Sequence, residues 1–555
     1  MTATPRSVRP AAAKAAKSAV PTLPAGWLAD LPELKLLAAE PGLRELQACR
    51  HVLVVFAADQ IASGSIPAAL PGVELLRQTL TRRRKKADAL LRKPAGGGKM
   101  PVAALIPEAT LPGGGLIRWL AVDTESSVFL RQQALREGFG PLLAEEPERV
   151  DVVLHGIAAF VRQTLADVAY VGCVNRVSLP RTGRPDVPEK QTRPAARKTQ
   201  KTGELRFWVG TDLKPAMRAA YATDLDWARC KAEANLLARA LCVLPPNQLT
   251  PSSFRAQIPA LTKGTGIKAD VYDIKRLLRL KAGAFLAVAQ GSPAQDAAIV
   301  HLSYVPKKKG APYVSLVGKG ICFDTGGHNL KPARYMAGMH EDMAGAATAL
   351  AVIRAAARLQ LPVRLDAWLA LSRNDISPAA YCQGDIVTAL NGLTIEIVHT
   401  DAEGRMVLAD TLSLAAKMKP DVVLDFATLT GSMTTALGNR MSGFFATDAD
   451  YALQLAIAGE SCGERVMAFA MPDDYDAALE SQVADVKQCT LDGEADHTLA
   501  ARFLNLFVGD VPWLHVDLSA ASCKGGLGAV GTETTGFGAA LALQFLREFL
   551  REPAS

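Results

Sequence analysis

Two short segments of the chain concentrate the residue types that bind metal ions or stabilise charge. Residues 317–342 read VGKGICFDTGGHNLKPARYMAGMHED, and residues 399–405 read HTDAEGR. Their ionisable residues include Lys319, Asp324, Lys331, Asp342, Asp401, Glu403 and Arg405. Carboxylates buried together repel one another and are driven to take up protons unless cations neutralise them. The two segments therefore predict a cage of oxygen ligands for hard divalent cations.

The first segment leaves a buried strand expected at residues 313–320 and then turns sharply. Gly326 and Gly327 follow Asp324 closely, so a tight backbone turn can aim its carboxylate. Asp342 is expected to open a helix, where the helix dipole favours an acid. The first segment therefore presents carboxylates at a strand end and at a helix start.

The second segment follows a strand expected at residues 393–400. Asp401, Glu403 and Arg405 fall on alternate residues, so an extended chain would direct them to one side. Each of these residues alone fits a helix cap or a surface ion pair equally well. Their concentration in two segments favours instead two divalent ions about 3.5–4 Å apart, bridged by carboxylates, with a hydroxide nucleophile.

The elements that must position these residues alternate between strands and helices. Strands are expected at 51–59, 116–124, 150–156, 297–305, 313–320, 364–372, 393–400, 421–431, 442–448 and 513–520. Helices are expected at 81–93, 127–143, 157–170, 342–359, 405–418 and 535–550, and from about 225 up to Pro245. This alternation predicts the α/β class, with two α/β domains and a mostly parallel central sheet flanked by helices in the C-terminal one. Ligands of such sheets bind at the carboxyl ends of the strands.

The length of 555 residues predicts more than one core. We expect a disordered basic tail at 1–26, an N-terminal α/β domain at 27–174, a basic connecting segment at 175–224 and a second domain at 225–552. The nine cysteines form no CxxC pair, which favours free thiols in a reducing compartment. No run approaches the roughly 18 apolar residues of a membrane helix. We therefore expect a cytoplasmic protein without a membrane partner.

Basic charge gathers at the N-terminus and in the residues 175–204. A solvated tail and insertion explain it most simply, although contact with nucleic acid stays an alternative. A DNA-binding or regulatory protein is therefore a second functional hypothesis. The GxGxxG pattern at 526–531 lies too close to the chain end for a dinucleotide fold, and the sequence contains no GxSxG or HExxH.

Several segments resemble the M17 leucyl aminopeptidase family. VGKGICFDTGGHNLKP and TDAEGRMVLAD resemble its signature segments, and LPPNQLTP, AFLAVAQGS, DFATLTGS and TGFGAAL fit its catalytic domain in order. The resemblance covers roughly residues 225–550. It implies a metallopeptidase that removes the N-terminal residue, leucine or another apolar residue, from peptide substrates. It also implies a homohexamer.

The resemblance assigns a role to each site position. Lys319, Asp324, Asp342 and Glu403 match the ligands of one metal, and Asp324, Asp401 and Glu403 match those of the other; the ions would be Mn²⁺ or Zn²⁺. Lys331 matches a lysine that stabilises the oxyanion. Arg405 matches an arginine that holds a bicarbonate ion, the general base. Met339, Thr428, Leu429 and Gly431 match substrate-binding positions.

The chain departs from the family pattern at a few positions. His399 stands where the family has Asn, and Ala344 stands where Gly is usual. His328 stands where a small apolar residue is common, and His340 lies nearby. His328, His340 and His399 are either additional metal ligands or, as we favour, surface residues or hydrogen-bonding neighbours of a ligand set that is already complete.

Overall fold

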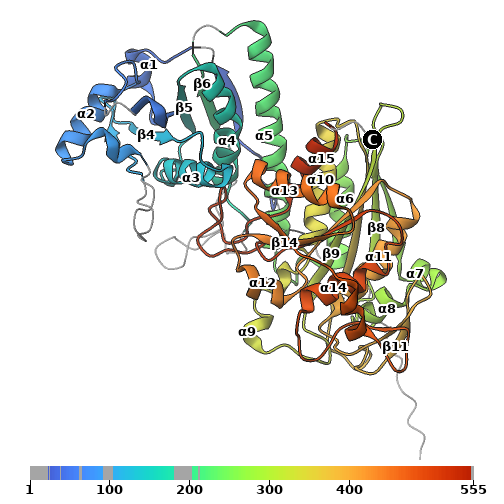
Figure 1. The fold of residues 1–555 in the computed structure, drawn as a ribbon. Coiled ribbons are helices and arrows are strands. Elements are labelled where there is room, and N and C mark those ends of the chain that lie inside the picture. Colours follow the sequence, from blue (N-terminus) through green and yellow to red (C-terminus); the bar gives the residue numbers. More distant parts are fainter. Residues whose placement is uncertain are drawn as a thin grey trace, which may run out of the picture.

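The computed structural model describes residues 23, 26–37, 39–61, 65–91, 104–180, 203–210 and 213–551. Most of the predicted basic tail, and residues 181–202 of the predicted connecting segment, lie outside these ranges. The chain folds around two separate large sheets, and the long helix α5 (Pro215–Cys242) runs between them (Figure 1). Within the described ranges, no helix has the length and apolar character that a bilayer crossing needs.

The N-terminal sheet is six-stranded, with the order β1-β6-β5-β2-β4-β3. Its strands are β1 (Glu33–Leu37), β2 (His51–Ala57), β3 (Glu108–Thr110), β4 (Leu116–Val122), β5 (Arg149–His155) and β6 (Glu204–Trp208). Its helices are α1 (Leu43–Ala48), α2 (Val73–Arg82), α3 (Val128–Ala144) and α4 (Ala158–Arg176). Only β3 runs antiparallel to its neighbour. The α/β character predicted for this part is confirmed.

Two local expectations for this part were wrong. The charged helix expected at 81–93 is absent, because α2 ends at Arg82 and Arg84 adopts a left-handed turn. A short 3-10 helix (Ala87–Leu90) follows and buries Ala87 and Leu90. Residues 204–208, expected within the connecting segment, instead form β6 between β1 and β5, since alternation places Leu205 and Phe207 in the core. The domain boundaries themselves stay predictions.

The C-terminal sheet is eight-stranded, with the order β15-β14-β17-β13-β9-β10-β8-β7. Its strands are β7 (Lys268–Asp273), β8 (Ala298–Tyr304), β9 (Tyr313–Asp324), β10 (Arg364–Asn374), β13 (Val422–Ala427), β14 (Ser442–Ala446), β15 (Val466–Ala468) and β17 (Trp513–Asp517). The central strands β17, β13, β9 and β10 run parallel, which confirms the predicted mostly parallel sheet.

Helices cover both faces of this sheet, as predicted. One core lies under α5, α6 (Pro251–Thr262), α10 (Ala344–Arg358), α13 (Ala449–Cys462) and α15 (Ala539–Phe549). The other lies under α7 (Ile274–Leu280), α8 (Gly283–Ala289), α11 (Glu403–Lys417), α12 (Gly431–Leu437) and α14 (Asp496–Asn505). Alternation along β9 divides its side chains: Leu316 packs into the first core and Val317 into the second.

The second chemical segment does not follow a strand of the main sheet, contrary to expectation. The predicted strand 393–400 is reduced to β12 (Thr394–Glu396), which pairs with β11 (Ile386–Thr388) and β16 (Val486–Lys487) in a small separate sheet. Glu403 is the first residue of α11. The helix, and not an extended chain, therefore sets the directions of Glu403 and Arg405.

Two glycines let α10 approach the centre of β9. A Cβ on Gly345 would overlap the carbonyl oxygen of Phe426 and lie 2.8 Å from the backbone N of Lys319. A Cβ on Gly318 would overlap the backbone of Gly345. The neighbours are backbone atoms, which cannot rotate away. Side chains at either position would therefore push the helix off the strand that carries Lys319 and Asp324.

We predict that Gly345→Ala destabilises the protein by about 1–3 kcal/mol or more, the usual cost of overpacking. Gly140→Ala is the matched control, because Gly140 also lies in a helix, α3, but has nothing near its missing Cβ. That change should alter the free energy of unfolding by less than about 1 kcal/mol, because the helix preference of alanine is opposed by crowding of its Cβ against the following Pro141. Urea unfolding of both variants measures the difference. Equal effects of the two substitutions would contradict the close-approach argument.

Candidate metal centre

The site begins at the carboxyl end of β9. Asp324 is the last residue of this strand, and its Oδ1 accepts hydrogen bonds from the backbone N–H of Gly326 (2.8 Å) and from Asn374 Nδ2 (2.9 Å). Asn374 ends the neighbouring parallel strand β10 in register with Asp324. Two strand ends and one tight turn therefore fix a buried carboxylate in place.

The turn after β9 requires glycine. Gly326 has φ +85°, in the left-handed region, and a Cβ there would lie 2.5 Å from Asn329 O and 2.9 Å from Asp401 Oδ1. Thr400 Oγ1 donates a hydrogen bond to Gly326 O (2.7 Å). The glycine turn thus allows the loop that carries Asp401 to pack directly against the end of β9.

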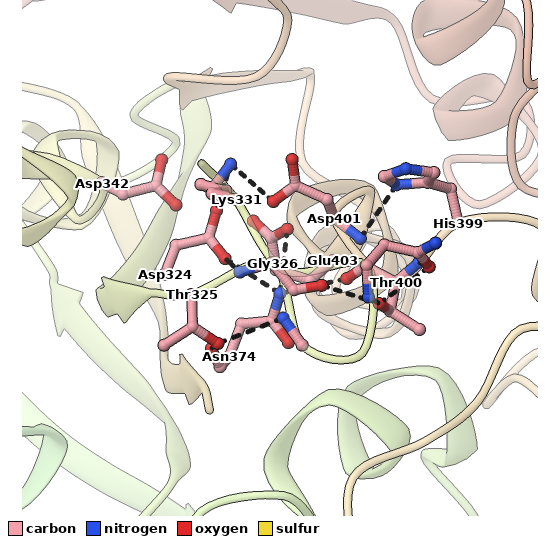
Figure 2. A network of polar contacts seen from close by, with 12 residues as sticks. Asp324, Thr325, Gly326, Lys331, Asp342, Asn374, His399, Thr400, Asp401 and Glu403 are labelled. Carbon is pink, nitrogen blue, oxygen red and sulfur yellow. Dashed lines mark hydrogen bonds and ion pairs between the residues drawn. The ribbon is translucent and has the colours of Figure 1, made fainter. Parts of the chain in front are cut away.

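Asp401 and Glu403 bring the second segment to the same place. One carboxylate oxygen each of Asp324, Asp401 and Glu403 lies within 4.8 Å of the others, a spacing that a metal ion could bridge (Figure 2). Glu403 is buried at the start of α11, and Asn374 Nδ2 lies 3.4 Å from its Oε2. The carboxylates come from three different elements and meet at one point.

Lys319 also belongs to β9 and precedes Asp324 on that strand. Its Nζ is 2.9 Å from Asp342 Oδ2 and 2.9 Å from Glu403 Oε1, and it donates a hydrogen bond to Thr428 O (3.0 Å). A Cβ on Gly404 would lie 2.7 Å from this Nζ, so α11 can begin here only with glycine after Glu403. Burial alone would lower the pKa of Lys319, but Asp342, Glu403 and Asp324 raise it.

Lys331 closes the cluster on the other side. Its Nζ lies 3.0 Å from Asp324 Oδ2 and 2.5 Å from Asp401 Oδ1. Burial opposes its charge, but the carboxylates of Asp324, Glu403 and Asp401 raise its pKa. The ammonium is therefore held protonated at the rim, where it is more exposed than Lys319.

Three carboxyl groups of the cluster have pKa values above those of ordinary acids. Burial, together with the neighbouring carboxylates Glu403 and Asp324, raises the pKa of Asp342 to about 8, although Lys319 opposes the rise. The same causes raise the pKa of Asp401 to about 7 against Lys331, and burial with Asp324 raises that of Glu403. The two lysines do not fully offset the negative charge of the cluster.

Several buried carboxylate oxygens of the cluster could accept a further bond from a cation. Asp342 Oδ2, Asp401 Oδ1 and Glu403 Oε1 are buried and accept no hydrogen bond of good geometry, although lysine ammonium groups lie close to them. Hard oxygen donors of this kind suit Mn²⁺ and similar ions. Lys319 could join them only after losing its proton, so its coordination would release one proton. The residues present therefore fit divalent metal.

Arg405 forms its hydrogen bonds with groups outside the carboxylate cluster. Its Nη1 donates a hydrogen bond to Gln488 O (2.9 Å), and its Nη2 donates one to Asp496 Oδ1 (2.6 Å). A carboxylate of the chain therefore occupies the position where the family resemblance predicts a bicarbonate ion. The residues around Arg405 do not fit a free bicarbonate as they stand.

The expected substrate positions lie along the end of β13 and beside Asp342. Thr428 Oγ1 donates a hydrogen bond to Asp342 Oδ1 (2.6 Å), and Leu429 N donates one to Asp517 Oδ1 (3.0 Å). Gly431 is exposed at the start of α12, and Met339 begins a short 3-10 helix (Met339–Glu341) that leads to Asp342. Of these four residues, Thr428 contacts the cluster directly through Asp342.

His399 and His328 form hydrogen bonds with neighbouring groups. His399 Nδ1 accepts the backbone N–H of Asp401 (3.2 Å), and burial lowers its pKa. His328 is exposed and contacts Ser377 O (3.1 Å) and Cys382 Sγ (3.2 Å). His340 is partly buried, which lowers its pKa. The ligand group formed by Asp324, Asp401 and Glu403 includes no histidine.

Sequence reasoning missed Asn374, Gln488 and Asp496. Asn374 had a usable signal, because it is a polar residue just beyond a predicted parallel strand, where ligands gather. Gln488 and Asp496 had none. They lie more than eighty residues beyond Arg405 in irregular sequence, and only the folded chain brings them to it.

Comparison with known proteins identifies relatives of the region that carries the site. The model of the "Cytosol aminopeptidase family, catalytic domain" matches residues 236–543. A probable cytosol aminopeptidase of Chlorobaculum tepidum is 41% identical over 314 residues, which are 56% of this chain and 62% of the relative. One of Stutzerimonas stutzeri is 44% identical over 285 residues, 51% of this chain and 57% of the relative. The match thus spans about three-fifths of the curated relatives' length.

Solved structures extend the likeness to nearly the whole chain. A mutant of tomato leucine aminopeptidase has a TM-score of 0.76 at 24% identity and covers 94% of this chain and 97% of its own, which shows a shared fold. The bottromycin maturation enzyme BotP, in complex with Mn, has a TM-score of 0.70 at 28% identity. The match covers 91% of this chain and 100% of the BotP chain. The N-terminal part therefore belongs to the shared architecture.

We predict that Mn²⁺ stabilises the protein more at pH 8 than at pH 5.5. The raised pKa values mean that protonation of the cluster stabilises the metal-free fold at low pH, and that this contribution is lost as pH rises through about 7 to 8. Metal binding requires the deprotonated ligands. The rise in Tm on adding Mn²⁺ should therefore grow with pH, and should disappear in Glu403→Gln. A rise independent of pH would contradict this assignment.

Proposed function

This chain belongs to the cytosol aminopeptidase family, and on that premise we propose that it is a metal-dependent aminopeptidase that hydrolyses the first peptide bond of its substrates. One observation carries the proposal. Asp324, Asp401 and Glu403 converge within metal-bridging distance, with Asp342 and Lys319 beside them, inside the matched catalytic region. An M17-type metallopeptidase site consists of this ligand set.

The metal ligands follow the assignment that the resemblance implies. Lys319, Asp324, Asp342 and Glu403 would hold one ion, and Asp324, Asp401 and Glu403 the other. Two divalent ions would supply Lewis-acid activation of the scissile carbonyl and a water of lowered pKa. Manganese is favoured, since the similar BotP structure contains Mn; zinc is the alternative.

Lys331 stabilises the negative charge that develops on the scissile carbonyl oxygen. Its ammonium is kept protonated by Asp324, Glu403 and Asp401 and stands at the rim of the cluster. A fixed cation aimed at a developing oxyanion typically contributes a factor of about 10²–10³ to the rate. The same ion pairs that hold Lys331 therefore prepare it for this role before substrate arrives.

Recognition of the substrate terminus falls to the opposite side of the cluster. Asp342 lies between Lys319 and Thr428 and would receive the free amine of the peptide, which restricts attack to the first bond. The strand end with Thr428, Leu429 and Gly431 would bind the substrate backbone, and Met339 would contact the first side chain. Leucine and other apolar residues are the proposed preference.

Assembly and location complete the proposal. The family resemblance supports a homohexamer, and the names of the relatives, which are cytosol aminopeptidases, support a cytosolic location. Sedimentation of the purified protein would test the assembly. A monomer at micromolar concentration would contradict it.

We predict that the purified protein, supplied with Mn²⁺ or Zn²⁺, releases the N-terminal residue from peptides. Glu403→Gln and Lys331→Ala should each lower kcat/KM at least about 100-fold, because the first removes a bridging ligand and the second the oxyanion cation. Glu460→Gln on α13 and Lys417→Ala on α11 alter exposed residues and serve as matched controls. Release of no residue from a broad peptide panel would contradict the proposed function.

A further inference from the structure

The guanidinium of Arg405 already holds an anion that belongs to the chain. Asp496 Oδ1 accepts a hydrogen bond from Nη2 at 2.6 Å, and Gln488 O accepts one from Nη1 at 2.9 Å. Gln488 also binds the loop before α11, because its Oε1 accepts the backbone N–H of Val398 (2.8 Å). The contacts of Arg405 therefore join α14, the segment after β16 and the loop that carries Asp401.

Burial shows that Asp496 covers the cation on its solvent side. The Arg405 side chain is 3% exposed, whereas that of Asp496 is 26% exposed. The Nε–H of Arg405 is buried without an acceptor, so it offers no open approach to a dissolved ion. An external anion would have to displace Asp496 to reach the guanidinium group of Arg405.

The backbone presents this carboxylate at some cost. Asp496 is the first residue of α14, and the preceding Ala495 adopts the left-handed conformation with φ +50°. A non-glycine residue in this region is strained. The strained residue and the helix start together orient Asp496 toward Arg405.

We propose that Asp496 is the built-in anion of the Arg405 site and replaces the free bicarbonate that the family resemblance implies. A tethered carboxylate forms the charge-assisted bond without losing translational freedom, a cost that a dissolved ion must meet on binding. Displacing Asp496 would in addition leave that carboxylate without its cation. The internal anion therefore excludes bicarbonate from the intact protein.

This inference rests on the proposed function where it concerns the reaction. Asp496 takes over the task of the anion at Arg405: its carboxylate accepts one proton from the attacking water. The water oxygen forms the new bond to the carbonyl carbon, the C–N bond breaks, and the proton passes to the leaving amine. The carboxylate is then regenerated, so protons and electrons balance.

The first experiment does not depend on peptidase activity. The Tm of the full-length, metal-free protein is measured with sodium bicarbonate, sodium formate or sodium chloride at equal ionic strength. The wild type should show no difference among the salts. Asp496→Ala should have a lower Tm in chloride that bicarbonate or formate raises by about 2 °C or more, since the ion refills the site. Stabilisation of the wild type by bicarbonate equal to that of the variant would overturn the proposal.

The second experiment measures peptide hydrolysis with Mn²⁺ in buffer depleted of carbon dioxide. Added bicarbonate should change wild-type kcat/KM less than two-fold. In Asp496→Ala, kcat/KM should fall at least about 100-fold, within the range for loss of a general base. Bicarbonate or formate should raise the kcat/KM of this variant about ten-fold or more. Asp496→Asn, which preserves shape, should lose activity without recovery.

The matched control is Asp476→Asn, which breaks the exposed pair of Asp476 with Arg502 on α14 and should leave both readouts unchanged. A wild type that needs bicarbonate, with Asp496→Ala equally active, would overturn the proposal. If no variant hydrolyses any peptide, the proposed function fails, and the Tm measurements still decide whether Asp496 is the resident anion.

Discussion

The mutual repulsion of buried carboxylates is the constraint on which the rest of this site depends. Two unit charges 4 Å apart interact by about 4 kcal/mol at the effective dielectric of a protein surface. Asp324, Asp342 and Glu403 are each buried, and the ammonium groups of Lys319 and Lys331 lie against them. Burial, together with repulsion among four acids that only two cations oppose, raises the pKa values of Asp342 and Asp401, and divalent metal would offset that charge imbalance.

The sheet and its helices are built to bring these charges together. Parallel strands β9 and β10 end side by side, which places Asn374 beside Asp324. At the start of α11, Gly404 leaves room for the Lys319 side chain, which a Cβ at this position would displace. Strand ends, a glycine turn and a helix start each supply one part, so the charged groups are held by backbone geometry and not by their own flexibility.

Arg405 divides the site into two chemically different halves. The first half consists of carboxylates and lysines, whereas in the second half Arg405 is bound to the carboxylate of Asp496 and the backbone carbonyl of Gln488. The loop of residues 398–402 is held by Gln488 through Val398 and by Tyr381 and Asn374 through Thr400. Gln488 therefore links Arg405 to the loop that carries Asp401.

The sequence by itself determined the class of fold and the residues of the cluster. Runs of β-branched and aliphatic residues located most strands, and residues 317–342 and 399–405 contain a set of acids and lysines that solvated surface does not explain. The extended geometry expected for Glu403 was wrong, because β12 is short and α11 starts at that residue. Local patterns describe periodicity, and they do not fix where one element gives way to the next.

Only the tertiary structure decided which groups meet. Asn374 reaches Asp324 through strand pairing, and Asp496 reaches Arg405 from the start of α14. Residues of the expected connecting segment join the N-terminal sheet as β6. These contacts join residues that are far apart in the chain. The sequence around each residue contains no signal that identifies its partner. The local sequence determines which chemical groups are present, whereas the packing of the whole chain determines which charged groups form pairs.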